Sequence, residues 1–170
     1  MVQRPVPETR VEHLFIDVNV GVVRRGHPLL DGEITPERFA AFEHVTASRR
    51  GKPRGPIDEL LAERGLRRRV VTSVPTMNAA LLVVAQSDLV GRSGLRLAVG
   101  QVERLNPATF AFPFDLPSLP VVQAWHPRQE KDPAHAWLRG CVREIAAALP
   151  GGAAPKPVAG PGRVPGQGLS

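Results

Sequence analysis

A chain of 170 residues is long enough for one globular domain, and a hydrophobic fraction of 42% predicts a buried core rather than a disordered chain. The net charge of +6 comes mostly from scattered arginines, and the dense run at residues 67–69 has no aromatic neighbours, which argues against nucleic-acid binding by these residues. The single cysteine, Cys141, excludes an internal disulfide and a cysteine metal cluster.

The N-terminal segment, residues 1–11, is polar and proline-rich, which predicts a flexible lead-in. It contains no apolar stretch typical of a signal peptide. The longest apolar run, residues 79–85, is far shorter than the about 20 residues that span a bilayer. We therefore expect a cytoplasmic protein that makes no membrane contact.

The first predicted element is a strand over residues 14–23, where β-branched residues alternate with others. A turn through His27 follows. Thr35 is the expected N-cap of a short helix that starts at Pro36, because threonine caps and proline suits the first helical position. Residues 44–48 are the next predicted strand.

The middle of the chain predicts two helices around a strand. The first helix opens at Gly55-Pro56 and ends at Gly65, which serves as a left-handed cap. Residues 68–74 form the strand, which breaks at Pro75. Thr76 then caps a helix that is apolar nearly all round, so we expect it to be buried.

The last third contains a short extended stretch at 88–91, a helix from residue 95, a proline-interrupted edge segment at 110–120 and a strand at 121–126. Asp132 caps a long final helix. Its expected inward stripe is Trp137, Leu138, Cys141, Val142, Ile145 and Leu149. Residues 150–170 are of low complexity, which predicts a disordered tail.

Strands and helices alternate along the chain, which predicts an α/β architecture with a largely parallel sheet. In such sheets, ligands bind beyond the carboxyl ends of the strands, beside helix N-termini. The break from Val74 through Pro75 to Thr76 is such a place. A carboxylate would suit it, but an ordinary strand-to-helix connection explains the residues equally well.

A search for catalytic or metal-binding patterns finds none. His13 with Glu12 and Asp17 could hold a cation, but a solvated strand start is the favoured interpretation. No serine sits in a G-x-S-x-G turn. Cys141 lies on the apolar stripe, where an inert thiol is expected. The sequence therefore predicts a protein that is not an enzyme and that has no metal or cofactor.

Three stretches taken together resemble one family. They are VVRRGHPLLDGEITPERFAAFEHV at 22–45, RGPIDELLAERGLRRRVVTSVPTMNAALLVVAQSDLV at 54–90 and VVQAWHPRQEKDPAHAWLRGCV at 121–142. Their ordered motifs resemble the effector-binding domain of LysR-type transcriptional regulators over residues 12–149. These motifs are His-Pro-Leu, Gly-Leu-x-Arg, a Val-Pro-Thr break and a Trp-His ending.

The resemblance implies an α/β, type 2 periplasmic-binding-protein-like fold, in which two crossover strands join two lobes around a cleft. One lobe, with a mixed or parallel sheet and flanking helices, is expected complete at about 26–88. Segments of 89–149 would return to the C-terminal part of the other lobe, and His27 would be structural. The implied ligand-binding positions are Ala47, Ser48, Arg49, Val74, Pro75, Thr76 and Met77.

Two features depart from the family pattern. The family's helix-turn-helix and the first half of one lobe have no counterpart in these 170 residues, so we expect a truncated domain without sequence-specific DNA binding. Arg92-Ser93-Gly94 replaces a Leu-Pro turn on the return crossover, which leaves the hinge geometry open.

The implied function is that of a sensor domain for a small-molecule effector, which could be anionic. Self-association or association with LysR-type regulators is the implied protein contact. Two alternatives stay open: a standalone interaction module that modulates full-length regulators, and a non-functional fragment.

Overall fold

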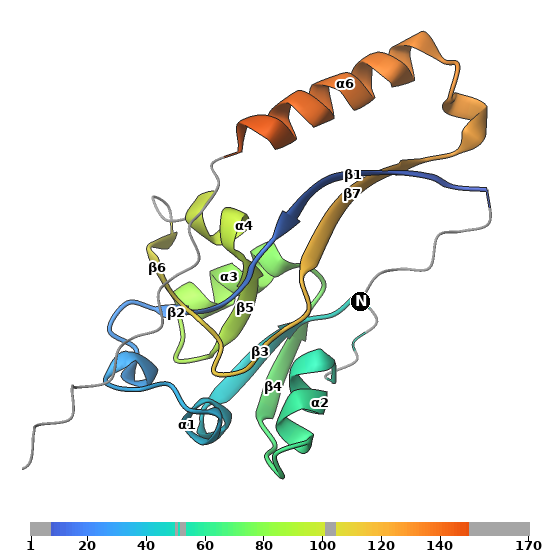
Figure 1. The fold of residues 1–170 in the computed structure, drawn as a ribbon. Coiled ribbons are helices and arrows are strands. Elements are labelled where there is room, and N and C mark those ends of the chain that lie inside the picture. Colours follow the sequence, from blue (N-terminus) through green and yellow to red (C-terminus); the bar gives the residue numbers. More distant parts are fainter. Residues whose placement is uncertain (1–7, 50, 52–53, 101–104, 150–170) are drawn as a thin grey trace, which may run out of the picture.

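The computed structural model describes residues 8–49, 51, 54–100 and 105–149 (Figure 1). The predicted tail, 150–170, and most of the predicted lead-in lie outside these residues. In chain order the elements are β1 (Arg10–Asp17), β2 (Asn19–Arg24), a 3-10 turn (Pro28–Leu30), α1 (Pro36–Ala41), β3 (Glu43–Ala47), α2 (Pro56–Ala62), β4 (Arg69–Val74), α3 (Met77–Ala85), β5 (Gly91–Gly94), α4 (Leu95–Gly100), β6 (Pro107–Phe110), β7 (Leu119–Trp125), a second 3-10 turn (Pro127–Gln129) and α6 (Pro133–Ala148).

The single strand predicted over residues 14–23 is wrong, because the chain divides there into two strands. β1 pairs with β7 in a two-stranded antiparallel ribbon, whereas β2 lies between β5 and β6 in another sheet. Val18 separates them and is exposed. Alternation along a sequence marks extended backbone but does not show where the chain leaves one sheet for another.

The central sheet is mixed, so the expectation of a largely parallel sheet was wrong. β2 is antiparallel to both β5 and β6, and β3 is parallel to β4. A parallel bridge joins the two groups, since Val45 N–H donates to Val90 O at 3.0 Å and Val90 N–H donates to Glu43 O at 2.9 Å. β5 therefore runs in the same direction as β3 and β4.

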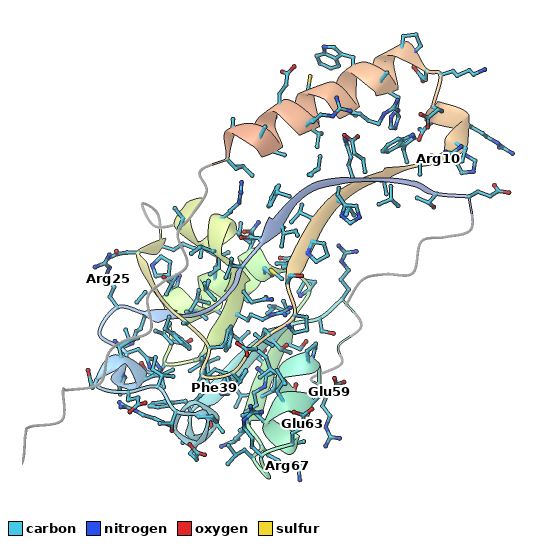
Figure 2. All side chains as sticks on the ribbon, viewed as in Figure 1. Arg10, Arg25, Phe39, Glu59, Glu63 and Arg67 are labelled. Carbon is cyan, nitrogen blue, oxygen red and sulfur yellow. The ribbon has the colours of Figure 1, made fainter. Side chains whose placement is uncertain are left out.

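Two hydrophobic clusters pack against opposite faces of this sheet. The first holds buried residues of β2, β3, α3 and α4: Val20, Val22, Val45, Ala80, Leu81, Val84, Leu95 and Ala98. The second holds Val23, Leu29, Phe39, Ile57, Leu61, Val90, Phe110 and Phe114. Phe39 points from α1 into this second cluster (Figure 2). Residues 19–116, which enclose both clusters, are called the body.

Local caps form as the sequence predicts. Thr35 Oγ1 accepts a hydrogen bond from Arg38 N–H at 3.2 Å, and Pro36 begins α1. Asp132 Oδ1 accepts from Ala134 N–H at 2.9 Å at the start of α6. Gly65 has a φ of 69°, the left-handed conformation expected of it. In contrast, α3 is buried on one side only, since Leu82 is 52% exposed.

His27 fastens the turn after β2 to the turn before β5. The ring of His27 is buried. Its Nδ1 accepts a hydrogen bond from Leu29 N–H at 3.0 Å, and its Nε2 lies 3.0 Å from Asp88 O. With Nδ1 accepting, Nε2 carries the proton and donates to that carbonyl. Arg24 forms an ion pair with Asp88 at 2.6 Å beside it. These contacts support the structural role expected for His27.

The ribbon β1–β7 and α6 extend away from the body (Figure 1) and are called the extension. α6 packs against β1. Glu12 of β1 accepts from Arg143 at 2.7 Å and from Gln123 at 2.9 Å. The guanidinium of Arg139, which is buried, lies 4.6 Å from the centre of the Trp125 ring.

The predicted inward stripe of α6 was wrong. Trp137 is 71% exposed and Ile145 is 65% exposed, and Leu138 and Leu149 are exposed as well. Cys141 is half-buried rather than buried. The helix turns Arg139 and Ala146 inward instead, and Val142 of the predicted stripe is half-buried. The ion pair of Arg143 with Glu12 and the cation–π contact of Arg139 with Trp125 join this side of the helix to the ribbon.

Candidate ligand site at the strand ends

The carboxyl ends of β3 and β4 lie side by side at one edge of the central sheet. Ala47 is in register with Val74. Just beyond, Ser48 N–H donates to Val74 O at 2.8 Å. The two groups of predicted site residues, 25 or more positions apart in the sequence, therefore meet at the same edge.

The N-terminus of α3 opens at this edge. Thr76 Oγ1 accepts from Ala79 N–H at 3.2 Å, and Thr76 O accepts from Ala80 N–H at 3.1 Å. The first N–H groups of a helix have no carbonyl partner within it, which leaves those of Met77 and Asn78 for other acceptors. Together with the helix dipole, they favour a negatively charged or hydrogen-bond-accepting group.

Exposure divides the predicted site residues. Arg49, Pro75 and Thr76 are exposed, whereas Ala47, Ser48, Val74 and Met77 are half-buried. Val74 packs against the first hydrophobic cluster, so its side chain faces away from the edge and it contributes backbone only. The edge thus offers backbone N–H groups, two hydroxyls and the cation of Arg49.

The sequence analysis missed two hydroxyls next to this edge. Thr46 is in register with Ser73, one residue before each strand end. Val45 and Val74 face the first cluster, so by alternation Thr46 and Ser73 face the opposite side of the sheet. The alternation of side chains in residues 43–47 and 69–74 could have indicated that Thr46 and Ser73 each face away from the apolar side. It places the two hydroxyls next to each other only once the two strands are known to pair.

The histidines and the cysteine give no catalytic arrangement. His44 is 1% exposed and its Nε2 lies 3.0 Å from Phe39 O. Burial, and after it the nearby charge of Arg68, lowers the pKa of His44 to about 4, so the ring is neutral and structural. Within the described part of the chain, no three acidic, histidine or cysteine side chains gather where they could hold a metal ion.

The two carboxylates of the candidate cation site at His13 bind other groups of the protein. Glu12 binds Arg143 and Gln123, and Asp17 accepts from Val18 N–H at 2.8 Å and from Arg96 N–H at 3.3 Å. Among the described residues, no helix is long and apolar enough to cross a membrane.

Comparisons with known proteins agree on one family. The sequence pattern of the LysR substrate binding domain matches residues 2–147. The HTH-type transcriptional regulator SyrM of Rhizobium meliloti is 38% identical over 136 residues, which is 79% of this chain and 41% of that protein. The chain thus spans less than half the length of this curated relative.

Solved structures show the same fold. A probable transcriptional regulator, PA0477 from Pseudomonas aeruginosa, superposes with a TM-score of 0.67 at 33% identity, over 81% of this chain and 46% of that one. The effector binding domain of QuiR in complex with shikimate superposes with a TM-score of 0.62 at 17% identity, over 83% of this chain and 66% of that one. These relatives are transcriptional regulators, and they give no support for an enzymatic role. The chain therefore belongs to the LysR family, and its residues 2–147 are a LysR substrate-binding domain.

Proposed function

We propose that the edge formed by Ala47, Ser48, Arg49 and residues 74–77 binds the small-molecule effector of a cytoplasmic LysR-type regulator. The hydrogen bond from Ser48 N–H to Val74 O carries this proposal, because it sets two strand ends and the start of α3 at one place. The proposed partners are the effector and other LysR-type chains, including copies of this one. The protein performs no catalysis in this proposal.

The QuiR domain, solved with shikimate, supports an effector that is a small organic acid. The free N–H groups at the start of α3 and the exposed Arg49 favour the same class of ligand. An effector held at this edge acts by favouring one arrangement of the domain over another, by as much as its affinity for the two differs.

A second candidate, a protein-interaction module, is favoured by α6. Its face made of Trp137, Leu138 and Ile145 is exposed and apolar. Such patches are typical of protein–protein contacts. This function and effector binding use different parts of the chain, so one experiment distinguishes them.

Hydrogen exchange tests both functions on the 170-residue chain. Shikimate and a panel of small carboxylic and hydroxy acids are added, and exchange is followed along the chain. An effector site at the strand ends predicts slower exchange at residues 46–49 and 74–79. Protection that appears only on α6, or a panel without any binder at millimolar concentration, contradicts the proposed site.

A matched pair of variants tests the location. Arg49→Glu reverses the charge at the proposed site, whereas Arg67→Glu reverses an exposed charge beyond the end of α2 (Figure 2). We expect Arg49→Glu to weaken binding of an acidic ligand and Arg67→Glu to leave it unchanged. Equal weakening by both variants would point to the net charge rather than the site.

A further inference from the structure

Arg92, on β5, carries a guanidinium that has no partner among the residues that the structure describes. Its side chain is half-buried. Across the part of the chain that the structure describes, the Arg92 side chain makes no hydrogen bond or ion pair. Its only charged neighbour of consequence is Arg68: burial, and after it this like charge, lowers the pKa of Arg92.

The carboxylate of Asp58 is held by Arg68 and by a backbone N–H. Asp58 accepts two hydrogen bonds from Arg68, both at 2.9 Å, and one from Gly55 N–H at 2.7 Å. The Arg68 side chain is only 5% exposed, so this pair is a closed structural unit. Within the described residues, neither Asp58 nor Asp17, whose Oδ2 lies over Gly94 of β5, forms an ion pair with Arg92.

The register of the sheet shows which face Arg92 occupies. Gly91 faces the first cluster, because a Cβ there would lie 2.8 Å from Val84 Cγ2. Arg92, the next residue, faces the opposite side, as does Gly21, its partner on β2. The ring of Phe110 fills the space over Gly21, which confirms that this side carries the second cluster.

Thr46 and Ser73 face the same side as Arg92. A parallel bridge joins His44 of β3 to Val90, so Thr46 and Arg92 each lie two residues beyond the bridge and face the same side as His44 and Val90. Ser73 stands beside Thr46 on β4. The three side chains form a polar row across neighbouring strands, one residue inside the proposed effector edge. In the described residues, neither hydroxyl has a hydrogen-bond partner.

Asn19 adds an unsatisfied acceptor to the same face. It pairs with Gly94 on β5, diagonally next to Arg92, and donates from Nδ2 to Pro117 O at 2.8 Å. Its Oδ1 is buried without a partner. The ring of Phe110 lies over Gly21, and the carboxylate of Asp17 lies over Gly94.

A partly buried guanidinium without a partner loses hydration without gaining a counter-charge, and an anion that reaches it restores the balance. A carboxylate matches the guanidinium in a bidentate geometry, and hydroxyls beside it can donate to the same oxygens. Arg92, Thr46 and Ser73 supply these donors.

We propose that Arg92 binds the carboxylate of the effector, with Thr46 and Ser73 as neighbouring donors, so that the effector is a small carboxylic acid. This inference rests on the proposed function and deepens it, since Arg92 lies beside the strand ends that form the effector edge. It makes Arg92 a specificity-determining residue.

Thermal melts of the full chain test the inference with benzoate and its uncharged isostere benzamide, and with formate against chloride at equal ionic strength. The variants are Arg92→Gln, Arg92→Lys and the control Arg67→Gln. We expect benzoate to raise the Tm of the wild type and of Arg67→Gln more than benzamide does. The benzoate Kd should rise about tenfold or more in Arg92→Gln, and less in Arg92→Lys.

The unliganded protein gives a second measurement. Arg92→Met removes the buried charge and keeps an apolar side chain, so its Tm without ligand should equal or exceed that of the wild type. A clear drop in Tm would show that Arg92 serves the fold, and would overturn the inference. Benzoate binding that is unchanged in Arg92→Gln would also overturn it.

The two failures can be told apart. If benzoate and formate act no more strongly than benzamide and chloride, while ligands of any charge protect residues 46–49 and 74–79 from exchange, the effector site stands and the assignment of Arg92 fails. If no ligand protects those residues, the effector site fails together with the assignment.

Discussion

The body and the extension bury their apolar side chains very differently. In the body, helices cover both faces of the central sheet, and residues such as Leu61 and Val84 are fully buried. In the extension, α6 covers one face of a two-stranded ribbon while Ile16 and Trp137 remain 66% and 71% exposed. The body therefore closes its own cores, whereas the extension presents apolar surface and free ribbon edges.

This difference indicates that the body provides most of the folding stability, whereas the extension provides the surface for association. Burial of apolar side chains stabilises the body, and removing a large buried ring there should be costly. The extension depends on ion pairs and hydrogen bonds such as Glu12 with Arg143, which have modest worth at an exposed surface. Its exposed apolar residues contribute little to folding and are available to another chain.

The largest effect is expected in the body. Phe39→Ala removes a ring that is 1% exposed and that lies 5.6 Å from both Phe112 and Phe114, ring centre to ring centre. We expect a loss of about 3–5 kcal/mol in the free energy of unfolding, measured by urea denaturation. A loss below about 1 kcal/mol would mean that the second cluster is not a core.

The next effect depends on pH and also belongs to the body. The folded pKa of His44 is about 4, below its ordinary value of 6.5, so the unfolded chain binds more protons between these values. The stability that neutral His44 provides is complete above pH 6.5 and is lost as the pH falls toward 4, by about 3 kcal/mol in order of magnitude.

Denaturation at pH 7 and at pH 4.5 measures this loss. His44→Gln keeps a donor for Phe39 O but does not titrate, so its stability should fall less with pH than that of the wild type. His13→Gln, an exposed position, is the control and should behave like the wild type. If His44→Gln shows the same pH dependence, other groups govern the acid response.

The extension should govern self-association. Trp137→Glu places a charge in the exposed apolar face of α6, and sedimentation velocity should then show less oligomer than in the wild type. Lys131→Gln, at an exposed position before the start of α6, changes the net charge by the same amount; it is the control and should leave association unchanged. A monodisperse wild-type monomer would contradict the idea that this face recruits another chain.

The smallest effect sharpens the contrast with Phe39. Because Trp137 is exposed, Trp137→Ala should change the free energy of unfolding by less than about 0.5 kcal/mol, measured at a dilution at which the chain is monomeric. A loss comparable to that of Phe39→Ala would show that the helix buries its apolar stripe in solution, as the sequence pattern alone suggested.

The predicted site illustrates how much of a ligand site sequence motifs can predict. The Val-Pro-Thr break and the end of the strand at residue 47 were identified from the sequence, and the structure brings them together through Ser48 and Val74. Arg92 was noticed only as a departure from the family pattern. No local pattern in the sequence indicates that Asp58 binds Arg68 while the Arg92 side chain, which lies near Arg68, has no ion pair among the described residues.

The sequence by itself determined the helix caps and turns, which depend on hydrogen bonds between residues close together in the chain. Thr35, Thr76 and Asp132 cap helices because each side chain reaches an N–H two or three residues ahead, and Gly65 turns because it lacks a Cβ. Family membership also followed from ordered motifs along the chain.

Only the tertiary structure decided which strands pair, which face of α6 turns inward and what surrounds Arg92. These depend on contacts between residues far apart in the sequence, such as Glu12 with Arg143 and Gly21 with Arg92. An apolar stripe on a helix indicates that its burial would be favourable, but it does not indicate which other element packs against it. The exposure of Trp137 follows from that, because the ribbon holds the opposite side of the helix through charged and polar contacts.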